Sequence, residues 1–114
     1  HAGHLPFWLA PVQVVVATIT EEANIHAGDL IKTLEDHDIR VLPDLRNEKI
    51  SYKIREHSLA KIPVMLVIGK KEKENGTVSI REYGNPARPT MQDEEVVKVL
   101  ATASRDRLLR VFDA

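Results

Sequence analysis

Two short segments made almost wholly of aliphatic residues constrain the fold of this 114-residue chain most strongly. Residues 12–19 (VQVVVATI) and residues 64–68 (VMLVI) alternate little between apolar and polar side chains. Such runs predict strands that are buried on both faces, which is typical of a parallel sheet covered by helices. We therefore expect an α/β fold.

Two segments with helical periodicity separate these strands. The first follows Thr20, a candidate N-cap. The second spans residues 51–61 and ends before Pro63. The residues expected to face the core are Ala23, Ala27, Leu30, Ile31 and Leu34 in the first helix, and Ile50, Ile54, Leu59 and Ile62 around the second.

The order of these segments predicts the topology of the sheet. A short strand is expected over residues 39–43, and right-handed crossovers make it parallel to the two buried strands. The segment GKKEKENG (residues 69–76) is predicted to be a charged turn, which makes residues 77–81 the antiparallel partner in a hairpin. A fifth strand near residues 88–91 precedes a helix that is expected to start at a Thr90 cap and to continue to Phe112.

Composition excludes several classes of protein. The apolar content of 43% and the charged content of 29% are typical of a soluble globular domain. Cysteine is absent, which rules out disulfides and thiolate metal sites, and no apolar run approaches the roughly 20 residues needed to cross a bilayer. Because the chain does not begin with Met, we expect it to be a fragment of a longer protein.

Positive charge is concentrated in one part of the chain. The whole chain carries a net charge of −1, whereas residues 40–61 contain six basic and three acidic side chains. A local basic face can bind an RNA backbone. The alternative is a solvated helix face with internal ion pairs, and charge alone favours that alternative.

The sequence offers no support for catalysis. It contains no glycine-rich nucleotide-binding motif, no nucleophile elbow and no histidine spacing typical of metal ligands. Three side chains instead suit RNA bases: the amide of Asn47, the carboxylate of Glu72 and the guanidinium of Arg81. Each has a structural alternative, since Asn47 suits a turn and Glu72 suits an ion pair with Arg81.

Several strings together resemble a known family. In order, they are FWLAPVQVVV, DLRNEKI, KIREHSL, IPVMLVIG and GTVSIR. Over nearly the whole chain they are similar to the C-terminal anticodon-binding domain of bacterial threonyl-tRNA synthetase. Prolyl-, histidyl- and glycyl-tRNA synthetases share looser versions of these strings, while the spacing DLRNEKI-x-x-KIREH points to the threonyl member.

The resemblance implies a fold and a context. The fold would be a three-layer α/β arrangement with a mixed five-stranded sheet and three helices. The sheet would contain three parallel strands and an antiparallel hairpin. Residues 1–11 would be a lead-in segment from an upstream catalytic domain, and residues 12–114 the anticodon-binding domain. The complete enzyme would be a cytoplasmic homodimer that ligates threonine to its tRNA, using ATP, magnesium and zinc in the catalytic domain. This segment would hold no cofactor, would not contact a membrane, and would be monomeric when isolated.

The resemblance also assigns residues to the anticodon. The family's contacts fall on Asn47, Lys61, Glu72 and Arg81. At Lys61 the family often has Arg, which makes a bidentate contact there doubtful. Glu72 and Arg81 would read the central guanine of the anticodon and Asn47 the third base. Lys49, Lys61 and Arg46 would contact phosphates.

Two other functions remain open from the sequence. The domain could be a protein-interaction or dimerisation module that lacks RNA specificity, or an α/β domain that binds a small molecule. The basic segment of residues 40–61 favours RNA over both.

Overall fold

The computed structural model describes residues 5–112, which form a five-stranded mixed sheet. The strand order is β2-β1-β3-β4-β5, with β1 parallel to β2 and β3, and with β4 antiparallel to β3 and β5. The strands are β1 (Val14–Thr18), β2 (Val41–Asp44), β3 (Val64–Ile68), β4 (Thr77–Glu82) and β5 (Thr90–Gln92). The mixed α/β sheet predicted from the sequence is therefore confirmed, with its parallel part and its antiparallel part where expected.

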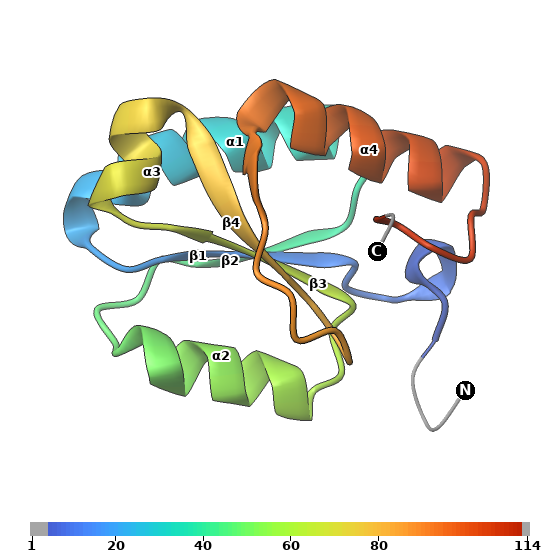
Figure 1. Cartoon of the computed structure of the whole chain (residues 1–114), viewed down its shortest axis with the longest axis horizontal. Helices are drawn as coiled ribbons and strands as arrows, with labels where there is room; N and C mark the ends of the chain where they lie inside the picture. Colours follow the sequence, from blue (N-terminus) through green and yellow to red (C-terminus); the bar gives the residue numbers. More distant parts are fainter. Residues whose placement is uncertain (1–4, 113–114) are drawn as a thin grey trace.

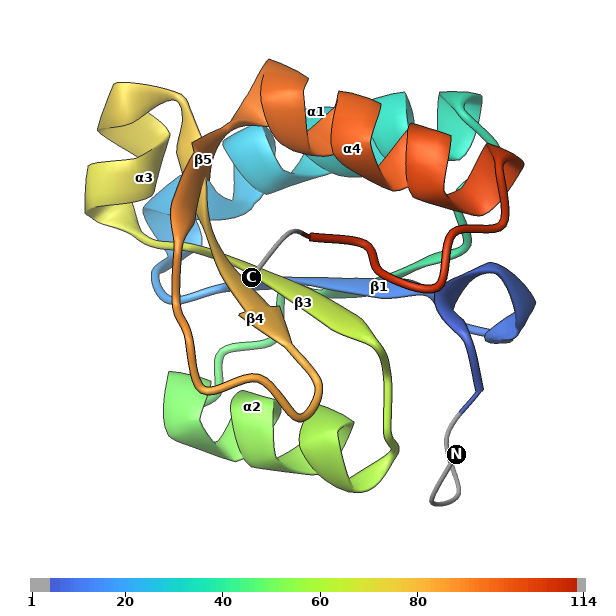
Figure 2. The ribbon, with the colours of Figure 1, turned by 45° about the vertical axis from the view of Figure 1, so that its right-hand side comes forward.

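Helices cover both faces of this sheet. Helices α1 and α4 lie on one face and α2 lies on the other, as Figures 1 and 2 show. The helices are α1 (Asn24–Asp36), α2 (Ile50–Leu59), α3 (Lys70–Asn75) and α4 (Asp93–Arg105), and two 3₁₀ turns, η1 (Phe7–Leu9) and η2 (Glu21–Ala23), precede β1 and α1. None of the helices in residues 5–112 has the length and apolar character needed to span a membrane.

Successive side chains of β1 and β3 point to opposite faces of the sheet, which divides the core into two parts. Val14, Val16 and Leu66 pack with α1 and α4 in the larger cluster. Val15 and Met65 belong to the smaller cluster, which lies under α2. Because both faces of these strands are covered, every residue of β1 and β3 is buried, as their unbroken apolar sequence predicted.

The segment between β3 and β4 differs from the prediction. Residues 69–76 were expected to be a turn, and they form α3 instead, so the described chain has four α-helices where three were expected. Lysine and glutamate favour a helix, and the backbone N–H of Gly69 donates to Glu72 Oε1 at 2.7 Å. Gly76 ends the helix with φ of 67°, a left-handed conformation that glycine adopts without steric cost.

The last helix is also shorter than predicted. It begins after Gln92 rather than at Thr90 and ends at Arg105 instead of continuing to Phe112. Arg107 adopts a φ of 54°, and the backbone N–H of Leu108 donates to Ala103 O, which closes the helix. Four apolar residues of this helix are buried, namely Val96, Val97, Leu100 and Ala103.

The lead-in segment is attached to the body of the domain. Arg40 donates from Nη2 to Trp8 O and from Nε to Ala10 O, both at 3.0 Å. Gln13, which is fully buried, donates to Phe7 O. Residues 1–4 of this predicted segment and residues 113–114 of the predicted domain lie outside the described residues.

Candidate nucleic-acid interface

The parallel strands bring four of the predicted site residues to one edge of the sheet. Strands β2, β1 and β3 end side by side at Asp44, Thr18 and Ile68. The loop of residues 45–49 follows β2 and carries three of the candidates, and α3, which carries Glu72, follows β3. Two strand spacings, about 10 Å, separate the two segments. We call this edge, formed by residues 45–49 and the first turn of α3, the carboxyl edge.

A buried cluster of charges lies directly beneath the loop. Lys53 is fully buried, and its Nζ donates to Thr18 O at 2.9 Å and to Asp44 O at 3.0 Å. His57 Nε2 lies 2.7 Å from Asp44 Oδ2. Lys53 and His57 therefore bind the inner face of α2 to the ends of β1 and β2.

Asp44 holds the centre of this cluster. Its carboxylate accepts two hydrogen bonds from Arg46, from Nε and from Nη2, each at 2.8 Å. Burial acts to raise the pKa of Asp44, but the hydrogen bonds from Arg46 and His57 and the charges of Arg46 and Lys53 outweigh it and hold that pKa well below its usual range. Asp44 is thus an ionised, fully engaged carboxylate at the base of the loop.

The placement of Lys53 and Leu59 corrects the sequence analysis. Lys53 was counted on a basic outer face and Leu59 was expected to face inward, whereas Lys53 is fully buried and Leu59 is 73% exposed. The spacing could have revealed this, because Lys53 and His57 follow Ile50 and Ile54 by three residues and share their side of the helix. Their burial depends on Asp44, a partner that helical periodicity alone does not reveal.

Arg46 is held by acidic side chains. Besides Asp44, its Nη2 donates to Glu56 Oε1 at 2.6 Å, and its guanidinium lies 5.8 Å from the centre of the Tyr52 ring. The hydrogen bonds that Arg46 donates to the carboxylates of Asp44 and Glu56 raise its pKa, so Arg46 stays charged.

Asp44, Glu56 and His57 offer ligand atoms within 4.8 Å of one another, as a metal site would. Arg46 bonds both carboxylates, however, and Lys53 Nζ lies 3.9 Å from Asp44 Oδ1. The protein's own cations already neutralise this donor set, so it is an ion-pair network rather than a site suited to a metal ion.

Asn47 and Lys49 point outward from the loop. Both are exposed, and neither side chain has a hydrogen-bond partner within residues 5–112. Lys49 precedes α2, and its carbonyl accepts from the backbone N–H groups of Tyr52 and Lys53. The loop therefore presents an amide and an ammonium group that are available to a ligand.

Glu72 has a structural role at its end of the carboxyl edge. Its Oε1 caps the backbone N–H of Gly69, while Oε2 has no hydrogen bond to any residue that the structure describes. No ion pair joins Glu72 to Arg81 in residues 5–112, so the alternative of a cross-strand ion pair is wrong.

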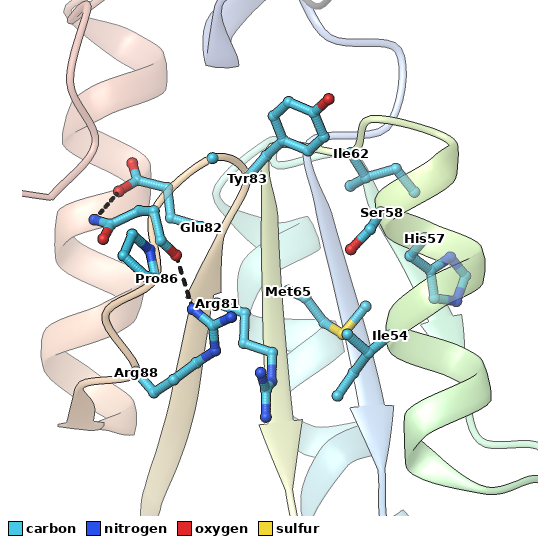
Figure 3. Close-up of a pocket in the computed structure, with 12 residues that line it drawn as sticks. Ile54, His57, Ser58, Ile62, Met65, Arg81, Glu82, Tyr83, Pro86 and Arg88 are labelled. Carbon is cyan, nitrogen blue, oxygen red and sulfur yellow. Dashed lines mark hydrogen bonds between the residues drawn. The ribbon is translucent and has the colours of Figure 1, made fainter.

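Arg81 lies in a pocket between α2 and the loop that follows β4. It pairs with Met65 of β3, and its guanidinium points along β3 toward the carboxyl end of that strand (Figure 3). The pocket has a volume of about 470 Å³, within the range of small-ligand sites, and Ile54, Ile62 and Met65 form an apolar wall.

One N–H group of the Arg81 guanidinium lacks a hydrogen-bond partner in the described part of the chain. This group is at Nε, which is buried. Burial, and then the nearby charge of Arg88, lower the pKa of Arg81. A buried donor without a partner is uncommon in proteins.

Lys61 lies apart from the other candidates. It follows the last turn of α2, whereas the loop of residues 45–49 precedes the first. Ten helical residues span about 15 Å, so Lys61 and Asn47 cannot contact the same base.

Comparisons with known proteins identify the family. Residues 13–103 match the family described as "Anticodon binding domain". A threonine–tRNA ligase of Rhodospirillum rubrum is 52% identical over 103 residues, which cover 90% of this chain and 16% of that protein. One from Bartonella tribocorum is 50% identical over 114 residues, covering 99% of this chain and 17% of the relative.

A solved structure agrees with these relatives. The RNA-binding domain of threonyl-tRNA synthetase from Cryptosporidium parvum Iowa II superposes with a TM-score of 0.83 at 28% identity, covering 89% of this chain and 26% of that one. This chain therefore spans about a sixth of the length of its bacterial relatives, and it belongs to the anticodon-binding domain family.

Proposed function

We propose that this chain reads the anticodon of threonine tRNA as the C-terminal domain of a threonine–tRNA ligase. The family match and the threonyl relatives support the assignment. The observation that carries it is Arg81, whose buried Nε has no partner and whose guanidinium lies in an open, partly apolar pocket. Such a pocket suits an unstacked base, which needs both an apolar contact and a hydrogen-bond donor.

Each base contact follows from the chemistry of the exposed groups. Arg81 offers a planar donor fork that matches the O6 and N7 acceptors of guanine. Glu72 Oε2 can accept from the amino and imino groups of the same base. Asn47 offers a donor and an acceptor, as reading of the third anticodon base requires.

The phosphate contacts divide between two places. Lys49 lies on the carboxyl edge beside Asn47, and Lys61 lies about 15 Å away at the far end of α2. We assign Lys49 to the phosphates of the anticodon bases and Lys61 to the flanking backbone. Arg46 is a weaker candidate than the sequence indicated, because Asp44 and Glu56 already bond its guanidinium.

The rest of the enzyme lies outside this chain. In this proposal the catalytic domain precedes residue 12, ligates threonine to the tRNA, and carries the ATP, magnesium and zinc. The complete protein is a cytoplasmic homodimer. None of the site residues described above is assigned to a cofactor.

Replacing Arg81 tests the proposal directly. We expect Arg81→Ala to weaken binding of a threonine anticodon stem-loop by about 1–3 kcal/mol and to relax discrimination at one base. The matched control is Arg55→Ala, because Arg55 is exposed on α2 and makes no hydrogen bond or ion pair in the described structure. Unchanged affinity of the Arg81 variant, measured by fluorescence titration, would show that the pocket does not bind the anticodon.

A further inference from the structure

We infer that Arg46 is a positioning residue for base recognition, since its guanidinium, held by Asp44 and Glu56, fixes the loop of residues 45–49 and with it Asn47. This inference rests on the proposed function. It replaces the phosphate-binding role that the sequence indicated for Arg46 with an indirect one.

The base of the loop is anchored from below. Lys53 Nζ donates to the carbonyls of Thr18 and Asp44, which are the last residues of β1 and β2. These carbonyls lie where strand pairing stops, and the ammonium group satisfies them inside the protein. The point at which β2 ends and the loop begins is thereby fixed.

Arg46 anchors the loop two residues later. Its two bonds to the Asp44 carboxylate are parallel, a geometry that defines the orientation of the guanidinium as well as its position. A third bond reaches Glu56 on α2, and the Tyr52 ring lies against the guanidinium. Arg46 therefore joins the loop to the strand before it and to the helix after it.

Asn47 lies between two fixed points. On one side is Arg46, whose carbonyl accepts from the backbone N–H of Glu48 at 2.9 Å. On the other side is Lys49, which begins α2. The Asn47 side chain has no partner within residues 5–112, so the backbone alone sets where its amide points. Without Arg46, the loop would sample other conformations and the amide would be misplaced.

Hydrogen exchange tests the anchoring without RNA. We expect Arg46→Gln to increase exchange of the Glu48 amide by about tenfold, because its acceptor lies in the loop, and to leave the buried amides of β3 unchanged. Arg55→Gln on α2 makes the same change of charge at a residue without hydrogen bonds or ion pairs in the described structure, and it should leave both unchanged. Equal exchange of Glu48 in the wild type and in Arg46→Gln would overturn the inference.

Base selectivity tests its consequence. Three stem-loops are titrated: the cognate one, one with the third anticodon base changed, and one with the central base changed. We expect Arg46→Gln to reduce discrimination at the third base by about tenfold, the order that a specific side-chain contact contributes, and to preserve discrimination at the central base within about twofold. Preserved discrimination at both bases would overturn the inference.

Arg46→Lys separates positioning from charge. Lysine keeps the positive charge but cannot form the two parallel bonds to Asp44. Positioning predicts that Arg46→Lys behaves as Arg46→Gln does. If Arg46→Lys binds every stem-loop as the wild type does, and Arg46→Gln weakens all of them alike, Arg46 contacts phosphate and the inference is wrong.

A wild-type protein that discriminates no base would contradict the proposed function, and hydrogen exchange would still decide the role of Arg46.

Discussion

Asp38, Lys61 and Arg107 share an unusual backbone conformation. They follow α1, α2 and α4, with φ of 62°, 59° and 54°, in the left-handed region that glycine prefers. In each case the next residue donates its backbone N–H to a carbonyl five residues earlier, which closes the helix. A side chain in this conformation costs on the order of 1–2 kcal/mol. Lys61 is also a proposed RNA contact, so its replacement affects both the stability of the domain and its binding of RNA.

Replacing Lys61 by glycine should separate stability from binding. We expect Lys61→Gly to raise the free energy of unfolding by about 0.5–1 kcal/mol, since relief of strain exceeds the entropy that glycine adds to the unfolded chain. The same variant should bind the stem-loop more weakly. Asp38→Gly is the matched control and should gain similar stability with unchanged binding. Urea unfolding and titration measure the two effects, and unchanged or tighter binding by Lys61→Gly would exclude Lys61 as an RNA contact.

Asp44 should make stability depend on acidity. Its folded pKa lies below the unfolded value of roughly 3.9, so its contribution is complete above about pH 4 and is lost as the pH falls toward the folded pKa. We therefore expect the stability difference between the wild type and Asp44→Asn to be about 3 kcal/mol at pH 7 and to shrink steadily below pH 4.

The control for this measurement is Asp93, which responds in the opposite direction. Burial raises the pKa of Asp93 despite the nearby His26, so its contribution is greatest at low pH and is lost as the pH rises. Urea unfolding of Asp44→Asn and Asp93→Asn between pH 2.5 and pH 7 should show stability differences from the wild type that change with pH in opposite directions. A difference for Asp44→Asn that does not vary with pH would contradict the assigned ion-pair network.

At the scale of elements, the sequence predicted what depends on local pattern. The buried runs in β1 and β3 and the inward face of α1 followed from periodicity, and the order of the segments predicted that β4 pairs antiparallel with β3. Helix α3 was missed because a charged segment between two glycines is also typical of a turn. The hydrogen bond from the Gly69 N–H to Glu72, which caps the helix, forms only in the folded chain. The burial of Lys53 was missed because it depends on carbonyl groups at the ends of β1 and β2, which the periodicity of the helix does not reveal.

The candidate site divides in the same way. Asn47, Glu72 and Arg81 were proposed from their residue types and from the resemblance, and these contacts remain predictions. The pocket around Arg81 was not predictable, since α2, β3 and the loop after β4 assemble it. The sequence indicated that Arg46 was free to bind phosphate. Its bonds to Asp44 and Glu56 form only in the folded chain, so they could not be predicted.

Two glycines should respond oppositely to the same substitution. Gly76 has φ of 67° at the end of α3, so Gly76→Ala should lower stability by about 1–2 kcal/mol. Gly28 lies inside α1, and a Cβ built there meets nothing within 4 Å, so Gly28→Ala should raise stability by about 0.5–1 kcal/mol. Midpoints of urea unfolding measure both, and a loss of stability in Gly28→Ala would mean that α1 packs differently.

The whole molecule combines a near-neutral charge with a local set of groups that are proposed to bind RNA. With a net charge of −1, the chain has no overall positive field to attract RNA, so affinity depends on contacts at the carboxyl edge and in the Arg81 pocket. The domain has apolar clusters on both faces of its sheet, which give it a core of its own. Binding should therefore be weak and sensitive to salt, and base selectivity is a more direct sign of function than affinity.

Titration of the chain at low salt with two stem-loops tests the central claim most directly. One is the anticodon stem-loop of a threonine tRNA, and the other differs only in having its central G changed to A. The proposed contacts of Arg81 and Glu72 predict preference for the G form by about 1–3 kcal/mol, since adenine lacks the O6 acceptor. Equal binding of the two would contradict anticodon reading and leave a domain that recognises only the RNA backbone.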